Sequence, residues 1–259
     1  MTLVLSSNLL LFVLLQLAGQ VAGIAVSYHA LFRRYRGPRH RIRVQDVVET
    51  YRTGFYGLVS SAVTTAYQNS PLLIAAAVIP NVVTVFAMCD RLYRIAQLSL
   101  VPVTQIAQGY VPAASSPLEL VRRMRVALFA SIMCGVVAWV AFAGLARPAS
   151  LLLSDSQIAV PPAAAVFLGA SVAITLLSSV SSRACLVAIG RVGAVAASAV
   201  AGAAVAMVGV YVGAVLWGVD GAALGVLAAE AVAFFVLIST LIRGAKQLLS
   251  GATEGNHEA

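Results

Sequence analysis

Charged residues are scarce in this sequence, and that scarcity excludes an ordinary soluble domain. Only 10% of the 259 residues are Asp, Glu, Lys or Arg, whereas soluble proteins carry about 25%. Hydrophobic residues make up 61% of the chain, and the mean hydropathy is +0.95. Most residues must therefore contact lipid or other buried helices, which leaves no room for a soluble domain of useful size.

Cysteine and histidine are also rare, and the few present form no recognisable chemical site. The cysteines are scattered through apolar runs without C-x-x-C spacing: Cys89, Cys134 and Cys185. We expect buried, unreactive thiols, with no disulfide framework, no metal and no cofactor. None of the three histidines lies beside a catalytic partner, and no loop pairs a histidine with an acid near a nucleophile. We therefore expect no enzyme.

The first apolar run, residues 1–32, lacks the basic residues that would precede the apolar core of a signal peptide. Its leader MTLVLSSN is uncharged, and the basic cluster RRYRGPRHRIR follows the run instead. Because cytoplasmic flanks carry excess Lys and Arg, this cluster places the end of the run in the cytoplasm. We expect a transmembrane helix whose N-terminus lies outside.

The remaining apolar runs predict an all-α, polytopic membrane bundle of about seven transmembrane helices, at about 20 residues per crossing. Basic residues gather after every second run, so one topology satisfies every loop and places the C-terminus in the cytoplasm. The net charge of +8 therefore reflects topology, and we expect no nucleic-acid partner. We expect crossings at residues 1–32, 53–79, 81–108, 126–146, 158–189, 192–217 and 221–242.

Proline, glycine and charge predict the connections between these crossings. The cytoplasmic side would hold a basic linker at residues 33–52, a loop at 109–125 and a tail at 243–259, disordered from Ser250. The outer side would hold a short connection between Pro71 and Pro80, a loop at 147–157 and a tight turn marked by Asp220. Pro161 and Pro162 suit the start of a helix. Three G-x-x-x-G pairs indicate close internal packing of helices: Gly19/Gly23, Gly209/Gly213 and Gly221/Gly225.

One stretch, Asn81–Gln108, is long and apolar enough to cross a membrane yet carries ionised residues. Wound as a helix, it gathers one set of polar side chains within about 100° of one another. This polar ladder consists of Asp90, Arg94, Gln97, Thr104, Gln105 and Gln108. Arg91 falls at its edge. Charged groups facing lipid cost several kcal/mol, so we expect the ladder to face protein or a water-filled cavity, with Asp90 paired to Arg94.

Polar residues in two other crossings are further candidates for function. Gln68 and Asn69 are amides in mid-membrane and require partners. Glu230 lies inside the last crossing, where an acid can mark a coupling site, although a carboxyl bonded to a neighbouring helix is the simpler interpretation. Arg183 lies near the inner end of its crossing, where extension of the side chain to the membrane surface is favoured over substrate contact.

Three stretches resemble the polysaccharide transporter family, whose members are O-antigen or lipid-linked oligosaccharide flippases related to the MATE exporters. NSPLLIAAAVIPNVVTVFAMCDRLYRIAQLSLVPVTQIAQGYVP is similar to the seventh and eighth helices of that family, with Asn69 as the polar residue and Asp90–Arg91–Leu92 as the acid-Arg-Leu step. CLVAIGRVGAV resembles the join of the tenth and eleventh helices, and GVDGAALGVLAAEAVAFFVL resembles the last helix, Glu230 included. The resemblance covers residues 45–245.

The resemblance implies a fold of two six-helix lobes joined by a basic linker. Residues 1–32 would be the sixth helix, 33–52 the linker and 53–242 the C-terminal lobe, with the first five helices missing. The orientation obtained from the charges agrees with that of a sixth helix. A second lobe, from another chain or from a homo-oligomer, is one way to complete such a protein.

We therefore expect part of a flippase that moves a polyprenyl-diphosphate-linked oligosaccharide across a bacterial cytoplasmic membrane, with membrane lipids as its other partners. The substrate-binding candidates are Arg91, Arg94, Asp90, Gln97, Gln105, Gln68 and Asn69, and Glu230 is the coupling candidate. The alternatives are a MATE-like exporter of cationic drugs, which would require an acidic cavity, a glycan polymerase or ligase, and a non-transporting lobe or assembly partner.

Overall fold

A computed structural model of the chain describes residues 70–254. The chain divides into two units, Met1–Thr53 and Gly54–Ala259, and the described residues belong to the second. Four expectations lie outside the described residues: the first crossing, the basic linker, the pair Gly19/Gly23, and the amides Gln68 and Asn69. The second crossing is described only from Ser70 onward.

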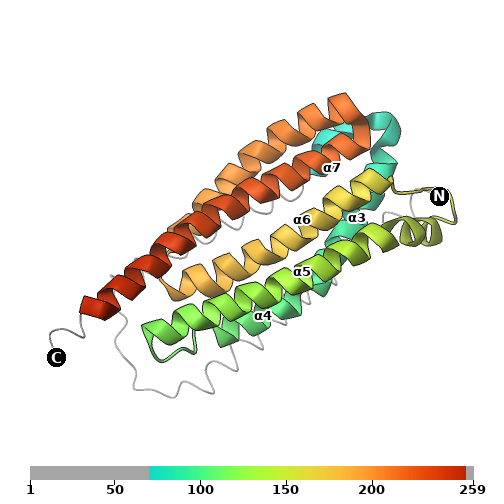
Figure 1. Cartoon of the computed structure of the whole chain (residues 1–259). Helices are drawn as coiled ribbons and strands as arrows, with labels where there is room; N and C mark the ends of the chain where they lie inside the picture. Colours follow the sequence, from blue (N-terminus) through green and yellow to red (C-terminus); the bar gives the residue numbers. More distant parts are fainter. Residues whose placement is uncertain (1–69, 255–259) are drawn as a thin grey trace, which may run out of the picture. The chain divides into compact units, whose positions relative to one another are not determined.

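The described residues are helical, with no strand among them. Three helices are long and apolar enough to cross a membrane, or four if one bent pair of helices forms a single span. The three are α5 (Pro117–Leu153), α6 (Pro162–Val180) with its π-helical continuation η2 (Ser181–Leu186), and α7 (Val192–Glu254). Figure 1 shows them packed along one another. The described part of the chain is thus a helical bundle of membrane type.

Helix α7 is a hairpin of two helices, because its backbone leaves the helical region at Trp217 and Gly218. Gly218 has a φ of 59°, which only glycine adopts at little cost. The orange and red arms then run back along each other in Figure 1. A Cβ on Gly221 would lie 1.9 Å from the Gly213 carbonyl oxygen, and Gly225 faces Gly209 in the same way. The two glycine pairs therefore pack arm against arm, as the G-x-x-x-G spacing predicted.

The turn of the hairpin precedes Asp220 instead of including it. The Asp220 carboxylate accepts a hydrogen bond of 2.9 Å from the Ala164 N–H in the first turn of α6. A carboxylate in this place bonds an N–H that has no partner within the helix, and its negative charge interacts favourably with the positive end of the helix dipole. Helix α6 begins at Pro162, where the Pro–Pro pair predicted a helix start.

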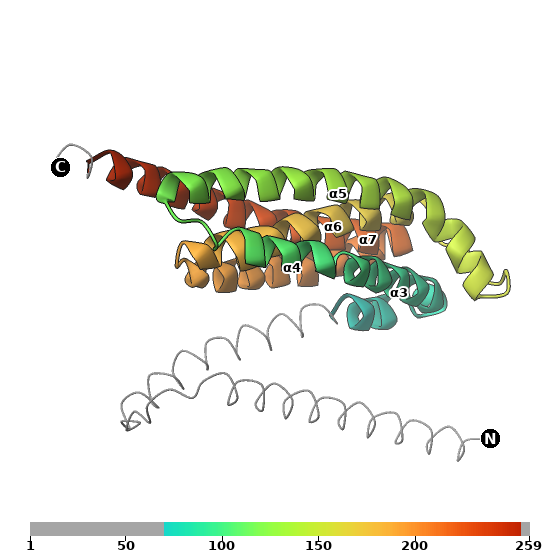
Figure 2. The same ribbon diagram turned by 90° about the horizontal axis from the view of Figure 1, so that it is seen from below.

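Helix α5 extends into the outer loop that was expected at residues 147–157. The helix continues through Pro148 to Leu153, and only residues 154–161 connect it to α6. A proline inside a helix removes one hydrogen bond and kinks the helix without ending it, and neighbouring helices make this tolerable in membrane proteins. Figure 2 shows the last turns of α5 bending away from the rest of the helix.

Helices α5 and α6 pack closely because small residues face each other. A Cβ on Gly135 would lie 3.3 Å from Ala173, and a Cβ on Gly169 would lie 2.8 Å from the Trp139 ring. The Trp139 indole N–H donates to the Val166 carbonyl at 3.1 Å, so its polar atom is satisfied within the pair. Close packing of this kind stabilises contacts between membrane helices by van der Waals attraction, because the hydrophobic effect is weak between helices in lipid.

The segment before the polar ladder is a helix where an outer connection between Pro71 and Pro80 was expected. Ser70–Val78 is helical and meets the helical stretch Pro80–Tyr110 at a bend of 116°. The bend falls at Ile79, whose φ of −127° and ψ of 59° are not helical. A residue before proline is driven out of the helical region, so Pro80 fixes the corner. Pro71 ends no element among the described residues.

The polar ladder itself is divided, although a single helix was expected. After the short η1 (Pro80–Val82), α3 runs over Val83–Ser99 and α4 over Val101–Tyr110. Pro102 lies in the first turn of α4. Around Leu100 the backbone forms hydrogen bonds between residues three apart, from the Leu100 N–H to the Gln97 carbonyl and from the Val103 N–H to the Leu100 carbonyl. Proline cannot continue the α3 hydrogen-bond ladder, so a new helix begins there.

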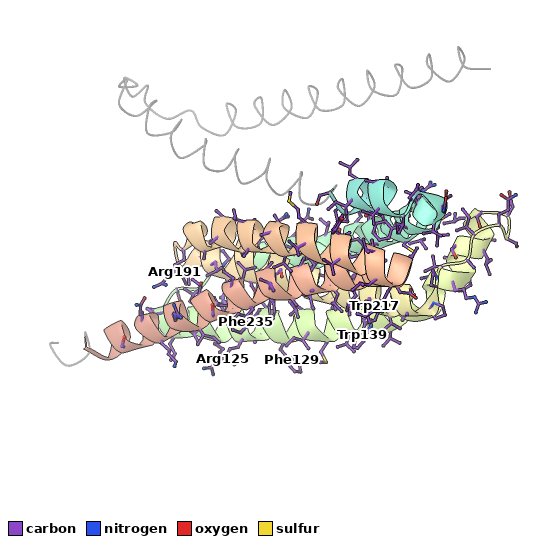
Figure 3. All side chains as sticks on the ribbon, turned by 90° about the horizontal axis from the view of Figure 1, so that it is seen from above. Arg125, Phe129, Trp139, Arg191, Trp217 and Phe235 are labelled. Atoms are coloured by element: carbon purple, nitrogen blue, oxygen red, sulfur yellow. The ribbon has the colours of Figure 1, made fainter. Side chains whose placement is uncertain are left out.

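Apolar side chains cover the outside of the bundle as well as its core. Two buried clusters fill the interior, one around Phe86 and Leu168 and the other around Val180 and Leu186. Phe129 and Phe235 are 64% and 71% exposed, and Figure 3 shows Phe129 at the outer edge of the bundle. An exposed apolar surface of this extent is typical of a protein that contacts lipid.

Basic residues gather at one end of the bundle, where α5 begins and where α6 and the second arm of α7 approach their ends. Figure 3 places Arg125 and Arg191 toward this end and Trp217 toward the other. We name it the basic end. Its members are Arg122, Arg123, Arg125, Arg183, Arg191, Arg243 and Lys246. Arg191 is bonded there to Gln247, and α7 remains helical to Glu254, so the expected disorder from Ser250 was wrong for Ser250–Glu254.

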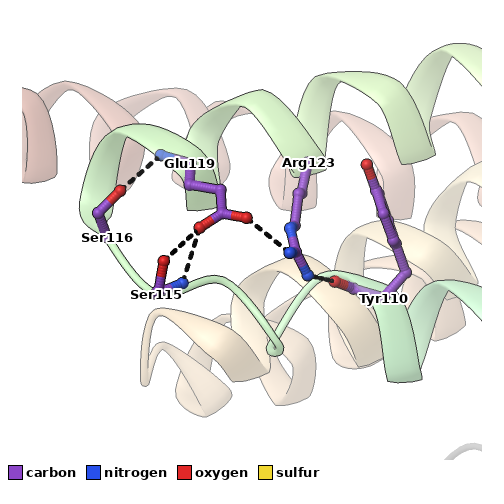
Figure 4. A network of polar contacts seen from close by, with 5 residues as sticks. All are labelled: Tyr110, Ser115, Ser116, Glu119 and Arg123. Atoms are coloured by element: carbon purple, nitrogen blue, oxygen red, sulfur yellow. Dashed lines mark hydrogen bonds and ion pairs between the residues drawn. The ribbon is translucent and has the colours of Figure 1, made fainter.

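The cytoplasmic loop expected at 109–125 is shorter than predicted, because α5 begins at Pro117. Ser116 caps the helix by accepting from the Glu119 N–H at 3.2 Å, and the Glu119 carboxylate accepts from the Ser115 N–H at 2.9 Å. These two bonds satisfy backbone N–H groups on either side of the Ser116 cap, and with proline in the first turn they make a strong helix start. Arg123 donates to the Glu119 carboxylate at 2.6 Å and to the Tyr110 carbonyl at 2.9 Å (Figure 4), and its guanidinium lies over the Tyr110 ring. These contacts fix α5 to the end of α4.

Candidate functional site

A cavity of about 420 Å³ lies between the α3–α4 side and the α6–η2 side of the bundle. We call it the α4–α6 cavity. Its volume is within the range of about 300–1,000 Å³ found for small-molecule pockets. The polar residues that line it are Arg94, Gln97, Thr104, Gln105, Gln108, Thr175, Ser179 and Arg183. Five of these eight belong to the polar ladder, so the ladder faces a hollow in the protein, as expected.

Thr175 connects the two walls of this cavity. Its hydroxyl donates to the Ser171 carbonyl at 2.8 Å, one turn back on α6. Because that bond uses its one hydrogen, the oxygen accepts from the Tyr93 hydroxyl at 3.2 Å and lies 3.5 Å from the Gln97 amide nitrogen. Thr175 thereby holds α3 against α6 at the level of Gln97.

Asp90 and Arg94 form the ion pair expected from their spacing, with 2.7 Å between the Asp90 Oδ2 and the Arg94 Nε. The side chain of Asp90 is 13% exposed and that of Arg94 is 38% exposed. Since Asp90 lies one turn before Arg94, the pair directs the guanidinium toward the N-terminal end of α3. Arg94 also lines the cavity, so its charge is held at the wall with Asp90 as its counter-ion.

A second, smaller hollow of about 30 Å³ adjoins the first, because Arg94 and Gln97 line both. We call it the Glu230 hollow. Its other polar lining residues are Asp90, Tyr93 and Glu230, and Glu230 is 9% exposed. The volume suits one or two water molecules. The structure thus brings together two acids that are 140 residues apart in the sequence, from α3 and from the second arm of α7.

The remaining candidates lie in different places. Gln105 lines the α4–α6 cavity and is exposed. Arg91 is exposed and lines neither the α4–α6 cavity nor the Glu230 hollow, in keeping with its place at the edge of the ladder. Gln68 and Asn69 are outside the described residues. Substrate binding by any of these residues stays a prediction.

The sequence reasoning missed the wall of the cavity that α6 and η2 supply. Thr175, Ser179 and Arg183 line it and are spaced four residues apart. Residues at this spacing share one face of a helix, so the pattern could have identified them. Arg183 was assigned to the membrane surface because it lies near the end of its crossing, and a position at the end of a helix does not exclude a place on a cavity wall.

The charged residues that line the α4–α6 cavity are arginines: Arg94, which is paired with Asp90, and Arg183. No Asp or Glu lines the cavity, among the residues that the structure describes. Three glutamine amides and three hydroxyls supply neutral hydrogen-bonding groups beside them. Guanidinium groups bind phosphate through paired N–H donors, and amides and hydroxyls bind sugar hydroxyls or water. The arrangement can therefore hold an anionic, polyhydroxylated group within an apolar bundle.

Comparison with protein-family models, with curated proteins and with solved structures finds no match to this chain.

Proposed function

We propose that this chain is part of a flippase that moves a polyprenyl-diphosphate-linked oligosaccharide across a bacterial cytoplasmic membrane. The proposal rests on one observation, the half-open cavity of about 420 Å³, lined by two arginines and three glutamine amides, in a bundle of membrane type. A drug exporter for organic cations would require an acidic cavity, and no acid lines this one among the described residues. The resemblance to polysaccharide transporters across residues 45–245 supports the same function.

In this proposal the basic end faces the cytoplasm, because cytoplasmic flanks of membrane helices carry excess Lys and Arg. The chain then crosses the membrane seven times, with residues 1–32 as the first crossing and an N-terminus outside. A second lobe or a second copy of the chain completes the transporter. The described helices would move against that partner to expose the cavity on either side.

The chemistry required of the chain is modest, since no covalent bond changes. A diphosphate in hydrocarbon carries a large solvation penalty, which a hydrated cavity with fixed cations reduces. Arg94 is held by Asp90 at 2.7 Å. An arriving diphosphate competes with that carboxylate for the guanidinium, so Asp90 keeps Arg94 oriented without blocking it. Gln97 and Gln105 bond the sugar hydroxyls or the water that accompanies them.

The experiment that tests the proposal replaces Arg94 with alanine in a strain whose own oligosaccharide flippase is deleted. We expect Arg94→Ala to abolish glycan export while the amount of protein in the membrane is unchanged, and Arg94→Lys to retain part of it. Arg147→Ala is the matched control, because Arg147 is an exposed arginine that lines neither hollow. Unchanged export by Arg94→Ala would contradict the proposed function.

A further inference from the structure

We propose that Arg183 is a second anion-binding residue, which receives the phosphate headgroup at the basic end of the α4–α6 cavity before the headgroup reaches Arg94. This inference rests on the proposed function and adds a path to it. Arg183 lines the same cavity as Arg94 but comes from the opposite wall, on η2. The two arginines therefore mark two positions along one cavity.

The local backbone sets the direction of Arg183. η2 is a π-helical segment, Ser181–Leu186, that continues α6. A π-helical turn contains more residues than an α-helical turn, so Arg183 stays closer to the line of Thr175 and Ser179 than regular α-helical winding would place it. Its neighbours Ala184, Cys185 and Leu186 are fully buried, whereas Arg183 is exposed along the cavity. π-Helical segments of this kind occur frequently at functional sites.

Arg183 differs from its basic neighbours in what surrounds its guanidinium. Arg123 is bonded to Glu119 and to the Tyr110 carbonyl, and Arg191 is bonded to Gln247. Among the described residues Arg183 has no ion pair and no hydrogen bond, and no acid lines the cavity into which it faces. An exposed arginine at the basic end of the cavity, with no such partner among the described residues, is available to bind an anion through its paired N–H donors.

The two arginines lie at different levels of the cavity. Helices α3–α4 and α6–η2 advance in the same direction, because Gln97 lies beside Thr175 and α4 contacts η2 further along. Arg183 is eight residues beyond Thr175, which is roughly 12 Å along the helix axis. Arg94 is directed the other way, toward Asp90. A headgroup that enters from the basic end therefore meets Arg183 first and Arg94 afterwards.

The test uses the full chain in detergent, with Cys89, Cys134 and Cys185 replaced by alanine and a reporter cysteine at Ser179. Ser179 lines the cavity one turn before Arg183. The rate at which a thiol reagent modifies Ser179→Cys is measured against increasing farnesyl diphosphate, with farnesol as the uncharged probe. We expect farnesyl diphosphate to slow the modification and farnesol to leave it unchanged.

Adding Arg183→Ala should raise the farnesyl diphosphate concentration for half protection by about tenfold, the effect of losing one charge-assisted contact. Arg183→Lys should raise it less, because the positive charge is kept. Arg125→Ala is the matched control, since Arg125 is exposed at the same end and does not line the cavity. An unchanged modification rate without ligand shows that Arg183→Ala keeps the local fold.

Three results would overturn the inference. The first is protection by farnesyl diphosphate that is the same in Arg183→Ala and Arg125→Ala, and the second is no protection of Ser179→Cys at all. The third is protection that disappears with Arg94→Ala but not with Arg183→Ala. Each of these leaves the proposed function standing if Arg94→Ala still abolishes glycan export. Conversely, export that survives Arg94→Ala contradicts the function even where Arg183 binds the diphosphate.

Discussion

Thr175 shows how a single hydroxyl can set the geometry of a cavity in a membrane bundle. Its oxygen accepts from Tyr93 on α3 while its hydrogen is bonded within α6. The Tyr93 side chain is itself buried, at 8% exposure. If Thr175 lost its oxygen, the buried Tyr93 hydroxyl would lose this bond, and a buried polar group without a partner is costly.

We predict that Thr175→Val destabilises the protein by about 1–2 kcal/mol, because valine keeps the shape of threonine but accepts no hydrogen bond. The free energy of unfolding in detergent, from a denaturant titration, checks this. Thr240→Val is the control, since among the described residues the Thr240 hydroxyl bonds only to the Val236 carbonyl of its own helix, at 2.9 Å. Equal losses in the two variants would show that the contact with Tyr93 contributes nothing.

Arg94 and Arg183 differ at this same scale in how far the sequence could place them. The position of Arg94 followed from the helical spacing of the polar ladder, and its pairing with Asp90 followed from the four-residue separation. Both were confirmed by the ion pair and by the cavity beside it. The spacing of Arg183 from Thr175 and Ser179 places it on their helix face, but what that face meets could not be predicted, because the residues across the cavity are more than 70 residues away in the chain.

At the scale of elements, the two arms of α7 depend on glycine more strictly than any other contact described. The backbone atoms of Gly213 and Gly221 leave no space for a side chain, since a Cβ on Gly221 would meet the Gly213 carbonyl oxygen at 1.9 Å. Overpacking at a backbone contact cannot be relieved by a side-chain rotation. The arms would have to separate along their length.

We predict that Gly221→Ala destabilises the protein by about 3 kcal/mol, at the upper end of the usual cost of overpacking. Gly144→Ala in α5 is the matched control, because a Cβ there meets nothing within 4 Å. Alanine should stabilise that helix slightly, by about 0.5–1 kcal/mol. Thermal unfolding of both variants in the same detergent measures the difference, and a Gly221→Ala variant as stable as the parent would refute the close contact.

Element boundaries were the least successful part of the sequence reasoning. Pro71 and Pro80 were interpreted as the bounds of a short connection, Pro117 as part of a loop, and Pro148 fell within the outer loop expected at 147–157. In the structure Pro117 begins α5, Pro148 lies within it, and the segment between Pro71 and Pro80 is helical. The effect of a proline depends on whether its missing N–H would have been bonded, which is decided by the position in the helix. The sequence S-P-L-E at Ser116–Glu119 did carry the signal of a helix start.

At the scale of the whole bundle, the distribution of charge sets one end apart from the other. The basic end holds seven Lys and Arg residues, whereas the other end of α5 and the α7 hairpin turn hold Arg147, Asp155 and Asp220. An asymmetry of this kind orients a helical membrane protein during insertion. The orientation can be measured directly from residues at the two ends of α5.

We predict that Ser115→Cys and Ser156→Cys, each in a variant without native cysteines, are labelled from opposite sides of the membrane. Both residues are exposed, and they lie just before and just after α5. A reagent that does not cross the membrane should reach Ser156→Cys in intact cells, and should reach Ser115→Cys only after the membrane is permeabilised. Labelling of both residues from the same side would contradict a membrane-spanning α5.

The sequence alone determined the class of fold and the polar face of the ladder. Both follow from properties local in the chain: composition fixes that the residues contact lipid, and the repeat of 3.6 residues per turn fixes which side chains share a face. The close packing at the α7 glycines was predicted for the same reason, from their four-residue spacing. These features require no knowledge of which helices become neighbours.

Only the tertiary structure decided what the polar face meets. Thr175 and Arg183 form the other wall of the cavity, and Glu230 joins Asp90 at the smaller hollow. These partners are brought together by the packing of α3 and α4 against α6 and α7, which depends on shape and small-residue contacts between helices far apart in the sequence. A cavity is the space that such packing leaves, so no single helix contains the information that defines it.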